Sequence, residues 1–349
     1  MSERIVSSDL NISENNNEIK LRPTSFTEYI GQEKVVANIE IMVQSSNIRQ
    51  QAMDHTLLSG PPGLGKTSLA MIIAKELNSE LHIISGPAIE KKGDIAAILT
   101  NLNARDVLFI DEIHRMNISL EEILYSAMED YRLDIVMGQG PSARTMQIDI
   151  APFTLIGATT RSGLLSNPLR DRFVAHLHFD FYAAKDIKTI IANNSSKLKL
   201  QIDDTALDKM SKCSRGTPRV ANRILKRVRD YALVNKTENI GSEEVNKSLA
   251  LMDIDCAGLD RMDRKIMEVI HDYYNGGPVG IEALCATLGE DRNTIEDVFE
   301  PYLLKEGYLL RTPRGREIST KAIHHLSKTI GGKKFITSKS KAHQQTTFL

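Results

Sequence analysis

Residues 60–67 read Gly-Pro-Pro-Gly-Leu-Gly-Lys-Thr and fit the pattern G-x-x-x-x-G-K-[ST], which constrains the fold more than any other feature of the chain. An apolar run, His55–Ser59, precedes the pattern, and an apolar helical segment, Leu69–Leu77, follows it. In such a strand–loop–helix unit, backbone N–H groups wrap a phosphate and the positive end of the helix dipole faces the same anion. The pattern therefore predicts a nucleotide phosphate loop, in which Lys66 reaches the β- and γ-phosphates and Thr67 holds Mg²⁺.

Short apolar runs alternate with helical patterns from about residue 26 to residue 180. This alternation indicates βαβ units and an α/β fold with a mostly parallel sheet and helices on both of its faces. We expect strands at His55–Ser59, Leu81–Ser85, Val107–Asp111 and Phe153–Ala158, and helices at Leu69–Leu77, Ile95–Asn101 and Leu120–Asp130.

One segment inside this region has a different pattern. Leu133–Val136 and Thr145–Ile150 flank the turn-forming residues Gly138–Pro141, which is typical of a β-hairpin with a long tip. A hairpin is unusual inside an α/β domain, so we expect it to protrude and to serve a function.

Two of the expected strands end in polar side chains that suit ATP chemistry. Val107–Asp111 is followed by Glu112, so a carboxylate pair lies at the carboxyl end of a strand, where α/β folds bind ligands. Asp111 is expected to hold Mg²⁺ through water, and Glu112 to polarise the attacking water as a general base. Phe153–Ala158 is followed by Thr159 and Thr160, and a hydroxyl there could orient the water or contact the γ-phosphate.

Three further arginines are candidates for contact with the transferred phosphate. Arg170 and Arg172 flank Asp171 in a Pro-punctuated turn, and the residues themselves leave open whether either is an arginine finger or a surface ion pair. Arg219 follows Pro218, which suits the first turn of a helix. At that position Arg219 could face a phosphate across a domain cleft.

The second half of the chain changes character. Helical patterns at Ile187–Asn193, Thr205–Ser211, Pro218–Val234 and Glu243–Leu251 predict a small all-α domain, and Asp253–Asp263 is expected to be a linker. Three helices and a two-stranded hairpin then predict a winged helix. Its elements are expected at Asp263–Tyr274, Gly280–Leu288, Arg292–Pro301, Tyr308–Arg311 and Arg316–Ser319.

Charge and composition narrow the class of protein. The 349 residues carry a net charge of −1, yet Arg311–Leu349 contains nine Lys or Arg and a single acid, Glu317. The wing carries Arg311, Arg314 and Arg316, which predicts salt-sensitive, sequence-tolerant contact with nucleic-acid phosphates. Three cysteines without a C-x-x-C pair, a polar N-terminus and the lack of a long apolar run indicate a cytoplasmic protein with no contact to a membrane.

Taken together, these motifs resemble those of the AAA+ ATPases, and more closely those of the RuvB family, the bacterial Holliday junction branch migration ATPases. The resemblance runs from about Leu21 to Ser319. It rests on LRP at 21–23, YIGQE at 29–33, GPPGLGKT at 60–67, SGPAIEKKGDIAAILTNL at 85–102, LFIDEIHRMN at 108–117, AMEDYRLDIVMGQGPSAR at 127–144, FTLIGATTRSGLL at 153–165, PLRDRF at 168–173, GTPRVANRILKRVRDYA at 216–232, GGPVGIEAL at 276–284 and EPYLLKEGYLLRTPRGR at 300–316.

The resemblance implies a role for individual residues. Arg172 matches the arginine finger that reaches a neighbouring subunit, Arg219 matches the second sensor, and Thr159 or Thr160 would be the first sensor. Contact with ATP and Mg²⁺ is implied for Leu21, Arg22, Tyr29, Ile30, Gly63, Gly65, Lys66, Thr67, Ser68, Glu129, Asp130, Tyr131 and Tyr182, and contact with DNA for Arg292, Arg311 and Arg316.

The resemblance also implies an assembly. A finger that acts in a neighbouring site requires an oligomer, and the family forms homohexameric rings on double-stranded DNA at Holliday junctions. The hairpin around 133–148 would dock a RuvA-type junction-binding protein, and a RuvC-type resolvase is a further implied partner. The expected organisation is a disordered segment 1–20, a large ATPase domain 21–182, a helical lid 183–254, a winged-helix domain 255–330 and a basic tail 331–349.

Two other classes of protein share part of this pattern. A clamp-loader-like replication ATPase would have the phosphate loop, the Asp-Glu strand and the finger, but would lack the RTPRGR wing. An ATP-switched winged-helix regulator would bind one DNA sequence in strong preference to others.

Overall fold

The computed structural model of the chain describes residues 21–137 and 144–329. The segment predicted to be disordered, 1–20, and the whole of the predicted basic tail, 331–349, lie outside this range, as does the tip of the predicted hairpin. The chain divides into two compact units: the first runs to Gln201 and includes Gly216–Arg223, and the second comprises Ile202–Arg215 and the chain from Ile224 onward. Within the described ranges, every helix is too short or too polar to cross a lipid bilayer.

The first unit is built on a five-stranded sheet in the order β2-β3-β6-β1-β7, and all four pairings are parallel. The three inner strands β3, β6 and β1 are almost wholly buried, which explains their largely apolar sequences. Four strands lie within one residue of the predicted bounds, whereas β7 was not predicted because its side chains alternate between exposed and half-buried. The strands are β1 (Thr56–Ser59), β2 (Leu81–Ser85), β3 (Val107–Asp111), β6 (Thr154–Thr159) and β7 (Ala175–His178).

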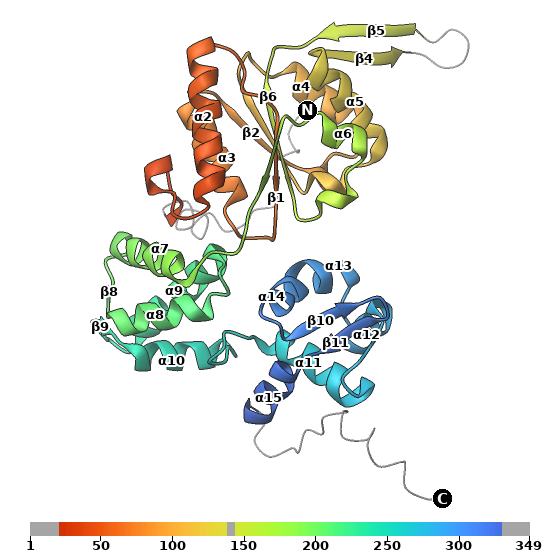
Figure 1. Cartoon of the computed structure of the whole chain (residues 1–349). Coiled ribbons are helices and arrows are strands. Elements are labelled where there is room, and N and C mark those ends of the chain that lie inside the picture. The colour runs from red at the N-terminus through yellow and green to blue at the C-terminus, as the bar shows by residue number, and fades with distance from the viewer. Residues whose placement is uncertain (1–20, 138–143, 330–349) are drawn as a thin grey trace, which may run out of the picture. The chain divides into compact units, whose positions relative to one another are not determined.

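Helices cover both faces of this sheet, as predicted. Figure 1 shows α2 and α3 on one side and α4, α5 and α6 on the other. Helix α2 was not predicted, because its buried residues form a narrow stripe (Val35, Ile39 and Val43) in an otherwise polar segment. These helices are α2 (Glu33–Arg49), α3 (Lys66–Glu76), α4 (Lys92–Thr100), α5 (Ile118–Glu129) and α6 (Asn167–Asp171). The first unit also includes α7 (Ala184–Lys197) and short 3₁₀ turns at Phe26–Glu28, Gly86–Ala88, Ile113–Arg115 and Ser162–Leu164.

The predicted hairpin is present as β4 (Arg132–Met137) and β5 (Arg144–Asp149), paired antiparallel with Leu133 opposite Ile148. Figure 1 shows these two strands projecting from the α/β unit. Leu133 is buried in the core beside Phe153, so the base of the hairpin is anchored to the domain that carries the sheet.

The second unit begins with a helical region that is not purely α-helical, which corrects the prediction. Two short strands, β8 (Gln201–Ile202) and β9 (Asn239–Ile240), accompany the helices, and the Asp203 N–H donates to Ile240 O at 3.0 Å. The helices of this region are α8 (Asp204–Cys213), α9 (Pro218–Val234), which the boundary between the units crosses, and α10 (Ser242–Leu251).

The remainder of the second unit is a winged helix, with a core that includes Ile266, Leu284 and Leu309. The third predicted helix is interrupted by a π-helical turn, and a further helix follows the wing. The elements are α11 (Arg261–Tyr274), α12 (Ile281–Leu288), α13 (Arg292–Thr294), the π-helix η6 (Ile295–Phe299), α14 (Glu300–Lys305), β10 (Leu309–Thr312), β11 (Gly315–Ile318) and α15 (Thr320–Thr329).

The segment predicted as a linker, Asp253–Asp263, is tied to its surroundings by buried ion pairs. Arg215 Nη2 lies 2.8 Å from Asp260 Oδ2 and 2.5 Å from Asp263 Oδ2, and Arg215 Nε donates to Gly258 O at 2.7 Å. Asp260 also caps α11, which begins at Arg261. Burial raises the pKa of Asp263 to about 7, although Arg215 opposes the shift. The segment up to Asp260 is thus a connection without regular structure, as predicted, and these contacts hold it in place.

The raised pKa of Asp263 predicts how stability depends on pH. In the unfolded chain this carboxyl ionises near 4, so between about pH 4 and pH 7 the folded state binds more protons and loses stability as pH rises. Asp263→Asn removes this pH-dependent loss of stability. The melting temperature of the variant minus that of the natural chain should therefore be larger at about pH 8 than at about pH 5. Thermal unfolding followed by circular dichroism measures this difference.

Glu243→Gln is the matched control. Glu243 is exposed and its pKa is lowered, first by the hydrogen bond from Lys247, so it stays ionised over this pH range. Its effect on the melting temperature should be the same at both pH values. A melting-temperature difference for Asp263→Asn that is equally insensitive to pH would contradict the assignment.

Candidate nucleotide site and wing

The phosphate loop connects the carboxyl end of β1 to the first residue of α3. Gly63 and Gly65 have φ values of 78° and 104°, in the left-handed region that favours glycine. A Cβ on Gly63 would lie 2.9 Å from Arg219 Cβ, and one on Gly65 would lie 2.5 Å from Tyr29 Oη. The loop is thus closely packed from outside and leads directly into the first turn of α3, the position at which a helix N-terminus and loop N–H groups bind phosphate.

Lys66 lies inside this loop. Its side chain is buried, and Nζ donates to Gly60 O at 2.7 Å and to Pro61 O at 2.9 Å. Burial lowers the pKa of Lys66 to about 8, Asp111 and Glu112 oppose that shift, and Arg219 adds to it. An ammonium group held between the loop and these two carboxylates is placed to contact the terminal phosphates of a nucleotide.

The parallel pairing of the strands brings the other predicted catalytic residues to the edge of the sheet that carries the phosphate loop. Ser59 is opposite Thr159 in the β1–β6 register, and the Gly60 N–H donates to Thr159 O at 3.1 Å. Strand β3, which ends in Asp111, pairs with the other side of β6. Thr67 on α3 and Asp111 on β3 offer side-chain oxygen atoms, which are the ligands that Mg²⁺ prefers. These residues therefore fit the ion predicted here.

Glu112 is the centre of a small hydrogen-bond network. Its backbone is left-handed, with φ of 51°, and the side chain is about one-third exposed. Thr160 Oγ1 donates to Glu112 Oε2 at 3.5 Å, and His114 Nε2 lies 3.4 Å from the same oxygen. Thr159, in contrast, is fully buried, with its hydroxyl against His114 Nδ1 at 3.0 Å. Of the two threonines, Thr160 is therefore the one that contacts the general-base candidate.

Sequence reasoning missed His114, which joins Thr159 to Glu112. Its sequence position matches neither a metal-ligand spacing with cysteines or acids nor a nucleophile pattern, so the residues alone give it no role. The only available signal was that His114 follows the Asp-Glu pair by two residues, on the 3₁₀ turn Ile113–Arg115.

Two tyrosines close the loop on its outer side. Tyr182 Oη donates to Leu64 O at 3.1 Å and Tyr29 Oη donates to Gly65 O at 3.3 Å, with 3.5 Å between the two hydroxyls. Burial raises the pKa of Tyr182 to about 12, and it raises that of Tyr29 as well, so both remain donors. The structure thus brings Tyr29 and Tyr182 to the phosphate loop, as predicted for the nucleotide site.

The other residues predicted for this side lie nearby. Leu21 is buried, Arg22 Nη1 donates to Met71 Sδ on α3 at 3.4 Å, and Ile30 is half-buried. The Arg219 N–H donates to Gly63 O at 3.3 Å while the residue itself is exposed. Ser68, beside Thr67, is half-buried at the start of α3.

Arg172 and Glu129 lie at the opposite edge of the sheet. Arg172 Nη2 is 3.0 Å from Glu129 Oε2, and the guanidinium lies 4.6 Å from the centre of the Tyr125 ring. The neighbouring residues Met128 and Val174 bond to His55, which precedes the amino end of β1. These predicted site residues, with the exposed Asp130 and half-buried Tyr131, are thus separated from Lys66 by the length of β1.

The winged helix carries the predicted DNA contacts in two different environments, with Arg292 on α13 and the others on the wing. Arg311 and Arg292 are exposed, with side-chain accessibilities of 58% and 55%. Arg316 is buried and binds Glu300, with 2.6 Å between Nε and Oε1, and Glu296, with 2.8 Å between Nη2 and Oε1. The structure therefore places Arg316 as an anchor of the wing and not on its surface, where a direct DNA contact would need it.

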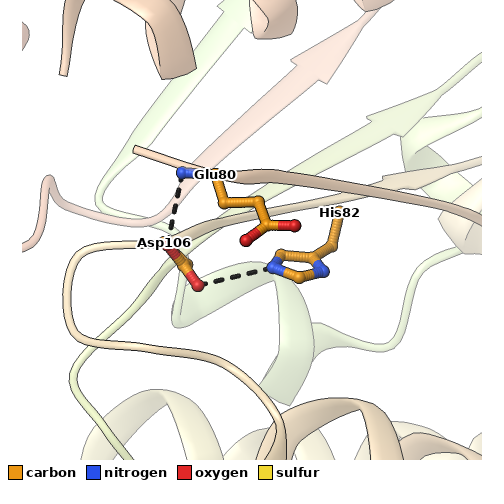
Figure 2. Close-up of side chains that lie close together, drawn as sticks. All are labelled: Glu80, His82 and Asp106. Atoms are coloured by element: carbon orange, nitrogen blue, oxygen red, sulfur yellow. Dashed lines mark hydrogen bonds and ion pairs between the residues drawn. The ribbon is translucent and has the colours of Figure 1, made fainter. Parts of the chain in front are cut away.

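A further group of possible metal ligands, Glu80, His82 and Asp106, lies where β2 and β3 begin (Figure 2). Asp106 Oδ1 accepts the Glu80 N–H at 3.2 Å, and Oδ2 accepts the Asn103 N–H at 2.8 Å and lies 3.4 Å from His82 Nε2. Both carboxylate oxygens thus hold the loop before β3 against β2. This group is a structural brace at the edge of the sheet opposite the phosphate loop.

Comparison with known proteins agrees with this architecture. Three family models match consecutive segments: the Holliday junction DNA helicase RuvB P-loop domain over residues 21–179, the RuvB AAA lid domain over 182–255 and the RuvB C-terminal winged helix domain over 256–327. The chain belongs to the RuvB family.

Relatives with known names match this chain over nearly its whole length. The Holliday junction branch migration complex subunit RuvB of Myxococcus xanthus is 52% identical over 328 residues, 94% of each chain. That of Staphylococcus saprophyticus is 50% identical over 95% of this chain and 100% of its own length. The solved Thermotoga maritima RuvB Holliday junction branch migration motor matches with a TM-score of 0.82 and 51% identity, covering 88% of this chain and 98% of that one.

The lowered pKa of Lys66 predicts a pH dependence of nucleotide binding in this RuvB-family chain. In the nucleotide-free protein, Lys66 loses its proton as pH rises through about 8. A bound phosphate stabilises the protonated side chain, so nucleotide binding above that pH is coupled to the uptake of a proton. The affinity for MgATP should therefore fall between about pH 7 and pH 9.5, while the phosphates stay fully ionised. Lys66→Arg, which keeps its charge, should bind more weakly but with little pH dependence. Titration with a fluorescent ATP analogue measures this; equal pH profiles for the two proteins would refute the prediction.

The two threonines predict different kinetic effects. Thr160→Val removes the hydroxyl that contacts Glu112 and should lower kcat for ATP by about tenfold to a hundredfold, with KM nearly unchanged. Thr159→Val removes a buried hydrogen bond and should mainly lower the melting temperature. Steady-state ATPase assays and thermal unfolding on both variants distinguish the roles, and the reverse pattern would assign Thr159 as the first sensor.

Proposed function

We propose that this chain is the ATP-driven motor subunit of Holliday junction branch migration in DNA recombination and repair. The observation that carries the proposal is the meeting of the phosphate loop, the Asp111–Glu112 pair and Thr160 at one edge of a parallel sheet, in a chain that ends in a winged helix. Its relatives are named as subunits of the Holliday junction branch migration complex. An enzyme of this kind would work in the cytoplasm, where bacterial DNA lies.

The proposed reaction is hydrolysis of ATP. The loop N–H groups and Lys66 would hold the phosphates, with Tyr29, Tyr182, Leu21, Arg22 and Ile30 around the rest of the nucleotide. Mg²⁺, held by Thr67 and Asp111, would neutralise charge on the phosphates. Glu112 would then orient and polarise the attacking water, and Thr160 would keep the carboxylate facing it.

The proposed assembly is a homohexamer. Lys66 lies at the carboxyl edge of the sheet and Arg172 beyond the amino edge, so the two do not meet within one subunit. A second copy that presents Arg172, together with Glu129, Asp130 and Tyr131, to the phosphate loop would complete the site. The incoming cation would stabilise charge that develops only in the transition state. Arg219, exposed beside Gly63, would contact the nucleotide from its own chain.

The proposed substrate is double-stranded DNA at a Holliday junction. Arg311 and Arg292 are exposed on the winged helix and would contact phosphates directly, while the buried Arg316 would hold the wing in place. The β4–β5 hairpin, including residues 133–148, would dock a RuvA-type protein, and a RuvC-type resolvase would join the complex. Hydrolysis in the first unit would then drive movement of duplex DNA.

The decisive experiment follows movement of a synthetic four-way junction with ATP, with and without a RuvA-type protein. Arg172→Ala should abolish movement and lower ATP turnover by on the order of 10³-fold, because its site lacks the finger. Arg170→Ala is the matched control: Arg170 Nη2 bonds Asn167 in its own turn, and its loss should leave movement largely intact.

The outcomes separate the proposal from its alternatives. Movement that requires ATP, is stimulated by the partner and fails only in Arg172→Ala supports the motor and the finger in trans. ATP hydrolysis without junction movement, even with the partner present, would indicate a clamp-loader-like ATPase. Strong preference for one DNA sequence would indicate a winged-helix regulator.

A further inference from the structure

Three of the arginines predicted to contact DNA converge on one carboxylate, that of Glu296. Arg316 Nη2 lies 2.8 Å from Glu296 Oε1, and Arg311 Nη2 lies 3.6 Å from the same oxygen. Arg292 Nε lies 3.2 Å from Glu296 Oε2. The side chain of Glu296 is only 10% exposed, although it lies among the most basic surface elements of the winged helix.

The backbone explains why these groups meet. Arg292 and Glu296 are one helical turn apart on the segment that contains α13 and η6, and Arg311 is directly opposite Arg316 in the β10–β11 pair. Glu296 lies in the π-helical turn Ile295–Phe299, and π-helical turns are frequent at functional sites. The helix and the wing therefore present their cations to a single acid from two sides.

The three arginines are not equivalent. Arg316 also bonds both oxygens of Glu300, at 2.6 Å and 3.2 Å, so it would stay neutralised if Glu296 lost its charge. Arg292 and Arg311 are more than half exposed, and exposed ion pairs are weak enough to exchange partners. Arg292 Nη1 also lies 3.3 Å from Oε1 of Glu282, which is itself largely exposed. The carboxylate of Glu296 is therefore shared between one fixed arginine and two that can turn to another anion.

We propose that Glu296 is an internal substitute for a DNA phosphate, which holds Arg292 and Arg311 together until a phosphate of the duplex takes them over. A carboxylate and a phosphate oxygen accept from guanidinium groups in the same way, so Glu296 competes with DNA for these two arginines. It thereby sets the strength and the salt dependence of duplex binding. This inference rests on the proposed function, because it assumes that the wing binds DNA.

The same arrangement bears on sequence selectivity. In a winged helix the third helical segment is the one that usually enters the major groove and contacts base edges. Here that segment carries Glu296 and Glu300 toward the wing, where they are occupied by arginines. Buried against the wing, these two acids leave the exposed Arg292 and Arg311 to contact the phosphate backbone, and such contacts carry no base readout.

The test is duplex binding by the full chain in the presence of a slowly hydrolysed ATP analogue, measured by fluorescence anisotropy over a range of salt concentrations. Glu296→Gln keeps the shape and removes the charge. It should tighten binding at about 100 mM salt by about threefold to tenfold, because Arg311 loses its carboxylate and Arg292 keeps only the exposed Glu282. The plot of log K against log salt concentration should become steeper by about one for each engaged wing, since more phosphate charge is neutralised.

Glu306→Gln is the matched control. It makes the same charge change in the same winged helix, but its partner is Lys321, with 3.3 Å between Nζ and Oε2. Its effect on affinity should stay within about twofold. Glu296→Asp keeps the charge on a shorter side chain and should fall between the natural chain and Glu296→Gln, which also serves if the glutamine variant folds poorly.

Each outcome is decisive. Equal effects of Glu296→Gln and Glu306→Gln would reduce the role of Glu296 to net charge and overturn the inference. Weaker binding by Glu296→Gln would make Glu296 a support for the wing and also overturn it. Failure of the natural chain to bind duplex DNA at all would instead overturn the proposed function.

Discussion

The parallel pairing of β1 with β6 and of β6 with β3 is the constraint on which the nucleotide site depends. Parallel strands all end at the same edge of a sheet, so the phosphate loop after β1, Thr160 after β6 and the carboxylates after β3 meet there although 100 residues separate the first from the second. None of these side chains reaches the site by a long loop. The rigid inner strands hold Glu112 and Thr160 within hydrogen-bond range, which is the precision that hydrolysis needs.

The same constraint bears on the proposed assembly. The amino edge of the sheet holds a second set of predicted site residues, with Arg172 and Glu129 beside the residues that flank His55. In the proposed hexamer, each subunit would carry the two halves of a site on opposite edges and would not join them itself. A ring of identical subunits would satisfy both edges of every copy, because a head-to-tail interface that closes repeats the same contact around the ring.

Local sequence patterns predicted much of this structure, and the failures have a common cause. Strong apolar runs located β2 and β3 to the residue, and Pro218–Val234 is one helix as expected. Helix α2 and strand β7 were not predicted, because α2 buries only a narrow stripe of side chains and β7 has one half-buried face. Which of their residues are buried depends on neighbours far away in the sequence.

The candidate site also divides into residues that local patterns predict and residues that depend on distant neighbours. Residue types and spacing predict Lys66, Asp111 and Glu112 as site residues, since each belongs to a short motif. They could not separate Thr159 from Thr160, because that choice depends on which hydroxyl faces Glu112 across the sheet. Nor could they reveal that Arg316 is buried, because its partners Glu296 and Glu300 belong to a helix that precedes the wing.

The ion pairs of this chain fall into two classes with different consequences. Arg215 with Asp263, and Arg316 with Glu300, are buried, and loss of one partner there would leave an uncompensated charge in a medium that solvates it poorly. Arg172 with Glu129, and Arg311 with Glu296, each include a group open to water, where a pair contributes about 0–1 kcal/mol. In the proposed motor, the first class would hold elements together through a cycle, whereas the second would exchange a carboxylate for a phosphate at little cost. Such a motor must bind and release phosphate groups repeatedly, and arginines kept on nearby carboxylates would do both without a large change in free energy.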